Sequence, residues 1–131
     1  MFLDSSALVA MLALEDDGPA LAARLDRHSV RTTSPLVVWE SALALSRILG
    51  VPAQSASDQI AEFLKRENIE ILAVPPEAGA RAVEAWARYG KGVHPANLNF
   101  GDCFSYAMAK LTGAPMLYKG ADFALTDIRP A

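Results

Sequence analysis

The sequence contains a single cysteine, Cys103, and only two histidines, His28 and His94. One cysteine cannot form an intrachain disulfide, and a chain so poor in thiols suits a reducing compartment. The two histidines are isolated from each other and from Cys103, so they do not show the ligand spacing of a zinc site. Disulfide scaffolds and zinc-based functions are therefore not expected.

Long hydrophobic runs and excess charge are also missing. The longest uninterrupted apolar run, residues 7–14, is far short of the roughly 20 residues that a membrane span requires. The residues before it carry an acid and no basic side chain, which is unlike a signal peptide. A net charge of −3 gives no general attraction to nucleic acid. We expect a soluble cytoplasmic protein with no membrane partner.

The composition is that of a globular domain. Of the 131 residues, 52% are hydrophobic and 21% are charged, a balance that excludes disorder. No repeat, low-complexity tract or linker divides the chain. We therefore expect one domain over residues 1–131, with a core large enough to need no disulfide or structural metal.

Short β-like runs alternate with helical ones along the chain. Strands are expected at residues 2–3 and in "VRTTS", "IEILAV", "APMLYKG" and, as a last short strand, "LTDI". Helices are expected up to about residue 14, over residues 19–28 and 102–111, and in "PLVVWESALALSRILG", "PAQSASDQIAEFLKREN" and "PPEAGARAVEAWARYG". This alternation predicts an α/β fold, with a central parallel sheet flanked by helices on both faces. Ligands of such sheets bind beyond the carboxyl ends of the strands.

Four acids lie where such a sheet would gather them. Asp4 and Asp122 each follow a predicted strand, Asp102 opens a helix, and Glu40 sits in an apolar helical turn where it should point inward. Each also has an ordinary explanation. Asp4 and Asp102 suit helix caps, Asp122 suits a turn, and Glu40 could pair with Arg47.

Four carboxylates at one place require compensation. At about 5 Å separation each pair repels by roughly 3 kcal/mol at an effective dielectric of about 20. Six such pairs exceed the stability of an ordinary domain, so the cluster must take up protons or hold a cation. Ligation by oxygen alone favours Mg²⁺ or Mn²⁺, which promote phosphodiester cleavage by activating water and neutralising phosphate charge. The hydroxyls of Ser5 or Ser6 could orient a carboxylate or water beside Asp4.

Four segments together resemble a known family. "DSSALVA", "WESALALSR", "LNFGDCFSYAMAK" and "MLYKGADFALTDI" are similar to the acidic motifs of PIN-domain ribonucleases, and most of all to VapC-type toxins of bacterial toxin–antitoxin modules. The resemblance covers essentially the whole chain and puts the metal-binding acids at Asp4, Glu40, Asp102 and Asp122. It implies Mg²⁺- or Mn²⁺-dependent endonucleolytic cleavage of RNA by metal-activated water. It also implies a homodimer and a cognate antitoxin of the VapB type, which inhibits the toxin and joins it on promoter DNA.

The sequence leaves the roles of several other residues open. Asp127 is an alternative to Asp122 as the fourth acid. Arg88, Lys91 and Lys119 precede two of the acids and are candidates for contacts with RNA phosphates, although ordinary surface charge explains them as well. The rings of Trp86 and Phe104 are expected in the core rather than as stacking platforms for bases.

Other functions are also compatible with parts of the pattern. The fold could serve as a catalytically silent module that acts through antitoxin or DNA association. A receiver-like phosphoacceptor domain would need an Asp after its middle strand, and "IEILAVPP" has none. A haloacid dehalogenase-like phosphatase would need a second Asp where "DSS" ends in serine.

Overall fold

In the computed structural model, which describes residues 1–131, four short strands pair in parallel in the order β3-β2-β1-β4. The strands are β1 (Phe2–Leu3), β2 (Arg31–Thr33), β3 (Ile69–Ile71) and β4 (Met116–Leu117). Phe2 pairs with Thr32 on one side and with Met116 on the other. Because every strand runs the same way, all four carboxyl ends meet at one edge of the sheet.

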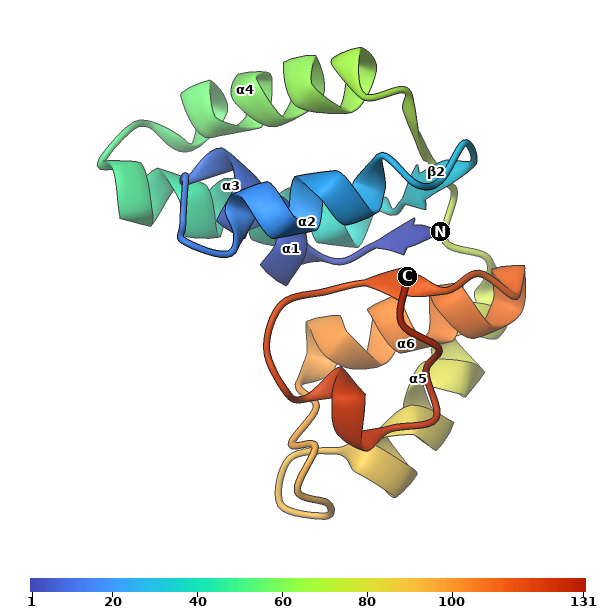
Figure 1. The fold of residues 1–131 in the computed structure, drawn as a ribbon. Helices are drawn as coiled ribbons and strands as arrows, with labels where there is room; N and C mark the ends of the chain where they lie inside the picture. The colour runs from blue at the N-terminus through green and yellow to red at the C-terminus, as the bar shows by residue number, and fades with distance from the viewer.

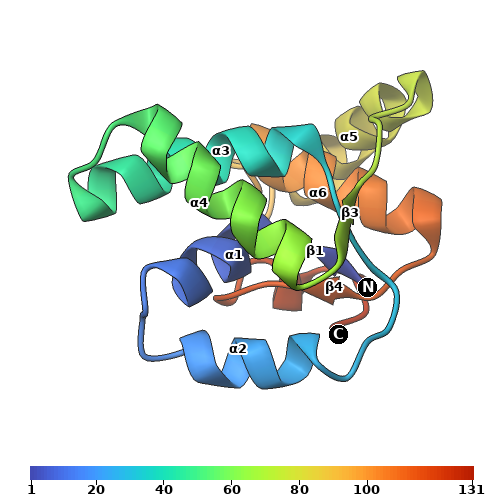
Figure 2. The ribbon, with the colours of Figure 1, turned by 90° about the horizontal axis from the view of Figure 1, so that it is seen from above.

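Six helices surround the sheet. Figures 1 and 2 show α2 on one side of the central strands and α6 on the other, with α5 packed on α6 and α3 packed on α4. The predicted α/β fold with a parallel sheet is thus confirmed. The bounds of the helices are α1 (Ser5–Leu12), α2 (Gly18–Leu25), α3 (Pro35–Leu49), α4 (Ala53–Arg66), α5 (Pro76–Tyr89) and α6 (Phe100–Thr112).

The local sequence explains where α3 begins and ends. The Ser34 side chain caps its N-terminus by accepting from the Val37 amide, and Pro35 occupies the first turn, where its missing N–H costs nothing. Gly50 ends the helix in the left-handed conformation, with a φ of 66°, which residues with a Cβ rarely adopt. These signals are local, so the sequence alone predicts where the helix begins and ends.

The core forms where the sheet meets the helices. The two residues of β1 and the two of β4 are completely buried, and they lie in one hydrophobic cluster with side chains from every helix. The largest fully buried side chains outside the sheet include Leu8, Leu25, Leu45, Ile60, Leu98 and Met108. Burial on both faces explains why the central strands are apolar without alternation.

The C-terminal segment differs from the prediction. The "LTDI" stretch forms no strand: its first residue ends a 3₁₀ helix, η1 (Phe123–Leu125), and the nearest β-bridge joins Met116 to Pro130. Phe123 is buried, with its ring 5.2 Å from that of Tyr118. The buried ring anchors the start of this segment, and the chain pairs with β4 again only at Pro130.

Two predicted helices are shorter than expected. α1 ends at Leu12 because Leu14 turns to a positive φ of 55°, and α2 ends at Leu25 rather than at residue 28. The prediction that the ring of Trp86, on α5, lies in the core was wrong. Val83 is 70% exposed and Trp86 43% exposed, whereas Ala78, Ala82 and Ala85 are buried. Small alanines let α5 lie close to α6, which leaves the larger side chains at the margin.

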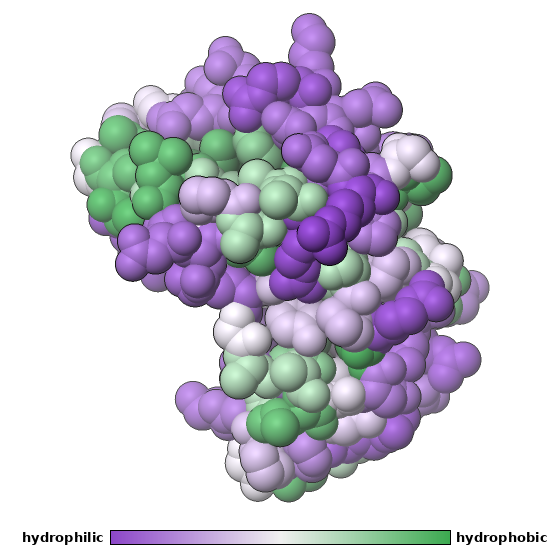
Figure 3. Space-filling model, viewed as in Figure 1, coloured by the Kyte–Doolittle hydropathy of each residue, from purple (hydrophilic) through white to green (hydrophobic).

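The surface carries some apolar side chains. Figure 3 shows a hydrophobic area over the turn between α3 and α4, where Ile48 and Leu49 are exposed. No helix on its own is long and apolar enough to cross a membrane, and only α3 and α4 taken together, bent by 118°, reach the necessary length and composition.

Leu45 on α3 offers a test of this core. Its side chain is fully buried, so Leu45→Ala should leave a cavity and lower the free energy of unfolding by about 2–5 kcal/mol, measured by urea denaturation. Leu49→Ala is the matched control, because Leu49 is one turn further along the helix and 41% exposed. Equal losses in the two variants would contradict this packing.

Candidate active site

Asp4 lies at the end of β1 and is only 1% exposed. It is the N-cap of α1, and its Oδ2 accepts hydrogen bonds from the Ser6 amide at 3.0 Å and the Ser6 hydroxyl at 2.6 Å. Its other oxygen, Oδ1, is buried and has no hydrogen-bond partner. Capping therefore explains the position of Oδ2, but it leaves Oδ1 buried with no donor to compensate its charge.

Ser6 links two strand ends at this edge. Its hydroxyl donates to Asp4 and accepts from the Lys119 amide at 3.0 Å. The Asp4 amide also donates to the Leu117 carbonyl at 3.0 Å. These bonds tie the carboxyl ends of β1 and β4 together, and the loop that carries Asp122 begins there. In Figure 1 this loop, the start of α1 and the start of α6 all lie on the left-hand side of the molecule.

Asp102 lies in the first turn of α6, where it forms a capping box with Asn99. The Asn99 amide donates to Asp102 Oδ2 at 2.8 Å, and the Asp102 amide donates to Asn99 Oδ1 at 3.0 Å. Burial raises the pKa of Asp102 to about 7, although the hydrogen bond from Asn99 opposes this change. Three negative charges add to the increase, those of Asp4, Glu40 and Asp122. The other three predicted acids are therefore close enough to Asp102 to influence it.

Glu40 reaches the same region from α3. Burial raises the pKa of Glu40, an interaction with the Ser5 side chain lowers it, and the charge of Asp4 raises it further. No ion pair joins Glu40 to Arg47, which is exposed, so the ordinary explanation for a carboxylate in this helix does not hold.

Glu40 packs against the backbone of α6 at Gly101. A Cβ on Gly101 would lie 2.6 Å from Glu40 Oε2 and 2.9 Å from Oε1. Only glycine allows this approach, since real Cβ contacts do not become so short. Gly101 thus admits the Glu40 carboxylate beside the turn that holds Asp102.

The two candidates for the fourth acid have different surroundings. Asp122 is exposed and its charge reaches Asp102. Asp127 instead accepts a hydrogen bond of 2.6 Å from the Tyr106 hydroxyl and pairs with Lys110 at 3.1 Å. Burial alone would raise the pKa of Asp127, but the bonds from Tyr106 and Lys110 hold it below its usual value. Asp127 is therefore already compensated, and Asp122 is not.

The three basic residues predicted to contact RNA phosphates are not grouped in one place. Lys119 pairs with Glu15 at 2.5 Å and with Asp17 at 3.3 Å. Arg88 donates to the Tyr89 hydroxyl at 2.9 Å and lies over the Tyr89 ring. Lys91 is exposed in the turn after α5 and makes no ion pair. Lys91 alone of the three has a side chain free to meet a phosphate without exchanging partners.

The acids match the needs of a hard divalent cation, although they do not form a finished ligand set. No three His, Cys, Asp or Glu side chains lie close enough together to make a preassembled metal site. The donor set is nevertheless all oxygen, one buried Asp4 oxygen has no donor, and the charged form of Asp102 is disfavoured. A divalent cation would relieve both penalties, and Mg²⁺ commonly keeps several waters and takes few protein ligands.

Two residues of this site, Asn99 and Gly101, were not singled out from the sequence. Asn99 was legible from its spacing, because Asn followed three residues later by Asp predicts a capping box. Ser5 was named only beside Ser6, and the interaction with Glu40 distinguishes it. Gly101 had no local signal, because its role depends on a side chain 61 positions away in sequence.

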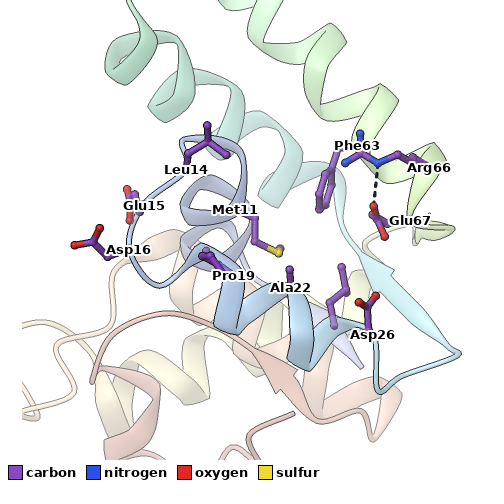
Figure 4. A pocket seen from close by; sticks show the side chains of 12 residues that line it. Met11, Leu14, Glu15, Asp16, Pro19, Ala22, Asp26, Phe63, Arg66 and Glu67 are labelled. Atoms are coloured by element: carbon purple, nitrogen blue, oxygen red, sulfur yellow. Dashed lines mark hydrogen bonds and ion pairs between the residues drawn. The ribbon is translucent and has the colours of Figure 1, made fainter.

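A large hollow lies elsewhere in the molecule. Figure 4 shows it between α1, α2 and α4, with a volume of about 560 Å³. Apolar side chains such as Met11, Ala22 and Phe63 line it, and the Arg66–Glu67 ion pair of 3.0 Å lies at its margin. None of the four acids lines this hollow, so size alone does not locate the chemistry.

The chain is similar to known proteins over nearly its whole length. A family model described as "PIN domain" matches residues 1–128. Ribonuclease VapC of Mycolicibacterium smegmatis is 41% identical over 128 residues, covering 98% of this chain and 97% of that protein. A VapC ribonuclease of Rhizobium meliloti is 37% identical over 139 residues, covering 97% and 98%. The crystal structure of Mycobacterium tuberculosis VapC20, described as a sarcin–ricin loop cleaving toxin, superposes with a TM-score of 0.73 at 21% identity over 98% of each chain. The chain therefore belongs to the PIN-domain family, in its VapC group.

Proposed function

We propose that this protein is a metal-dependent endoribonuclease and the toxin of a toxin–antitoxin module. The observation that carries the proposal is that burial, aided by the charges of Asp4, Glu40 and Asp122, raises the pKa of Asp102 to about 7. The names of the relatives at 37–41% identity, which are ribonucleases, support the same activity.

In this proposal the four acids hold Mg²⁺ or Mn²⁺. The bound ion would lower the pKa of a coordinated water and neutralise charge that develops on the phosphate. Ser6 keeps Asp4 Oδ2 in place and leaves Oδ1, which has no hydrogen-bond partner, for the ion. Asn99 does the same for Asp102 by bonding to Oδ2 alone. The chain thus orients two ligands through the caps of two helices, as outer-shell partners do in metal sites.

The proposed substrate is RNA, bound through its phosphates near the acids. Lys91 is free to make such a contact. Arg88 would first have to release Asp127, and Lys119 would have to release Glu15 and Asp17. We also propose a cognate antitoxin of the VapB type, a homodimer, binding to promoter DNA only through the antitoxin complex, and a cytoplasmic location. A catalytically silent binding module is the alternative, and no observed feature favours it over the enzyme.

Cleavage assays with structured RNAs test the activity. We expect cleavage in Mn²⁺ or Mg²⁺, none in EDTA, and a loss of at least about 100-fold in Asp102→Asn, which keeps an acceptor for the Asn99 amide but removes a charge. Gln replacing Glu62, an exposed acid on α4, is the control. Metal binding without cleavage by the wild-type protein would favour the silent module, and cleavage that survives EDTA would contradict the proposed mechanism.

The stability of the metal-free protein should depend on pH through Asp102. Its pKa is about 7 in the folded state and near 4 in the unfolded chain, so the folded state binds more protons between these values. Stability should therefore fall as pH rises from about 4 to 7, by about 1–2 kcal/mol after allowance for solvent screening of this partly exposed group. Urea denaturation in EDTA at pH 5 and pH 8 measures this, and the difference should shrink in Asp102→Asn.

Gly101→Ala tests the approach of Glu40. The added methyl would displace the Glu40 carboxylate, the flexible end of a side chain, so the free energy of unfolding should change by less than about 1 kcal/mol. RNA cleavage should fall by about 10–100-fold, because small misplacements of catalytic groups are costly. Gly79→Ala on α5, where a Cβ would meet nothing within 4 Å, should leave cleavage unchanged.

A further inference from the structure

We propose that the hydrogen bond between Tyr106 and Asp127 is a positioning contact, which holds the loop after β4 so that Asp122 stays beside Asp102. This inference rests on the proposed function, in which these two acids share a metal ion. Asp127 is then neither a ligand nor an ordinary surface acid. Its role is to fix another acid in space.

Asp122 needs such support because its own side chain has none. It is exposed, and only its backbone carbonyl takes part in a hydrogen bond, accepting from the Leu125 amide at 3.2 Å. An exposed carboxylate without a partner takes its position from the segment that bears it. The geometry at Asp122 therefore depends on how residues 120–127 are held.

One end of this loop is held at β4. The Phe123 side chain is buried and packs against the Tyr118 ring. Within the loop, the Thr126 hydroxyl donates to the Phe123 carbonyl at 2.7 Å and accepts from the Ile128 amide at 3.2 Å. These bonds make the segment from Phe123 to Ile128 a compact unit that would move as one piece.

The other end is held on α6 by two side chains. The Tyr106 hydroxyl donates to Asp127 Oδ1 at 2.6 Å, and the Lys110 ammonium donates to the Asp127 carbonyl at 3.1 Å and pairs with its carboxylate. Tyr106 is only 5% exposed, whereas the Asp127 side chain is 46% exposed, so the bond is shielded from water on the α6 side alone.

The same helix face also carries Asp102. Tyr106 follows Asp102 by four residues, and residues with this spacing project from the same face of a helix. A bond from Tyr106 to the loop thus sets the distance between the loop and the turn of α6 that carries Asp102. The position of Asp122 relative to Asp102 is therefore set through the rigid helix α6 and not through flexible chain.

Tyr106→Phe removes the hydroxyl and keeps the buried ring, and Asp127→Asn keeps an acceptor while removing the charge. Tyr89→Phe is the matched control, because its hydroxyl bonds to Arg88 and reaches Asp127 only through the long, 3.9 Å ion pair of that side chain. Amide hydrogen exchange at Leu125 and Thr126 and Mn²⁺ affinity from calorimetry are measured on the full-length protein. In Tyr106→Phe we expect loop exchange to rise about tenfold and the Kd for Mn²⁺ to rise about tenfold, with unchanged exchange at Leu45. Asp127→Asn should be intermediate and Tyr89→Phe unchanged.

The outcomes separate this inference from the proposed function. If the wild-type protein binds Mn²⁺ and the Tyr106→Phe and Asp127→Asn variants match it in affinity, the positioning role is wrong. The same holds if Tyr89→Phe has as large an effect as Tyr106→Phe. If the wild-type protein does not bind Mn²⁺, the proposed function fails, and the exchange at Leu125 and Thr126 alone decides whether the contact holds the loop.

Discussion

A carboxylate at the end of a buried strand is the constraint on which this site depends. Asp4 is almost fully covered, and one of its oxygens has no donor within reach. Leaving a charged oxygen in this state is unfavourable unless a proton or a cation compensates it. Glu40 and Asp102 increase this electrostatic cost, because burial disfavours their charged forms as well. The protein concentrates negative charge where a divalent cation would be most stabilising.

The same side chains that create this repulsion also build the fold. Asp4 caps α1 and Asp102 completes the capping box of α6, each through a single oxygen. Capping and metal binding are therefore compatible at one residue, since a carboxylate has two oxygens that accept independently. For each of these acids, the observed role as a cap does not exclude the proposed role as a ligand. An Asn at either position would preserve the cap and remove the charge.

The fold was largely legible from the sequence because its signals are local. Proline, serine and glycine mark the ends of α3, and the alternation of strands and helices predicts the parallel sheet. The errors came from long-range packing. Burial of Phe123 against Tyr118 turns the C-terminal segment into a 3₁₀ helix, and the close contact of α5 with α6 exposes Val83. The first contact leaves no trace in the spacing of residues. The second leaves only the helical spacing of Ala78, Ala82 and Ala85, whose small side chains give a weaker apolar signal than Val83 and Trp86.

For the candidate site, the sequence by itself determined which residue types were available. These were four acids next to apolar segments, with no histidine or cysteine cluster to compete for a metal. Only the tertiary structure decided that Glu40 meets the backbone at Gly101, that Asp127 is bound by Tyr106, and that Lys119 is paired with Glu15. The reason is physical: each of these contacts joins parts of the chain that come together only when the helices pack on the sheet. Local propensity places a side chain on an element, and packing alone decides what it faces.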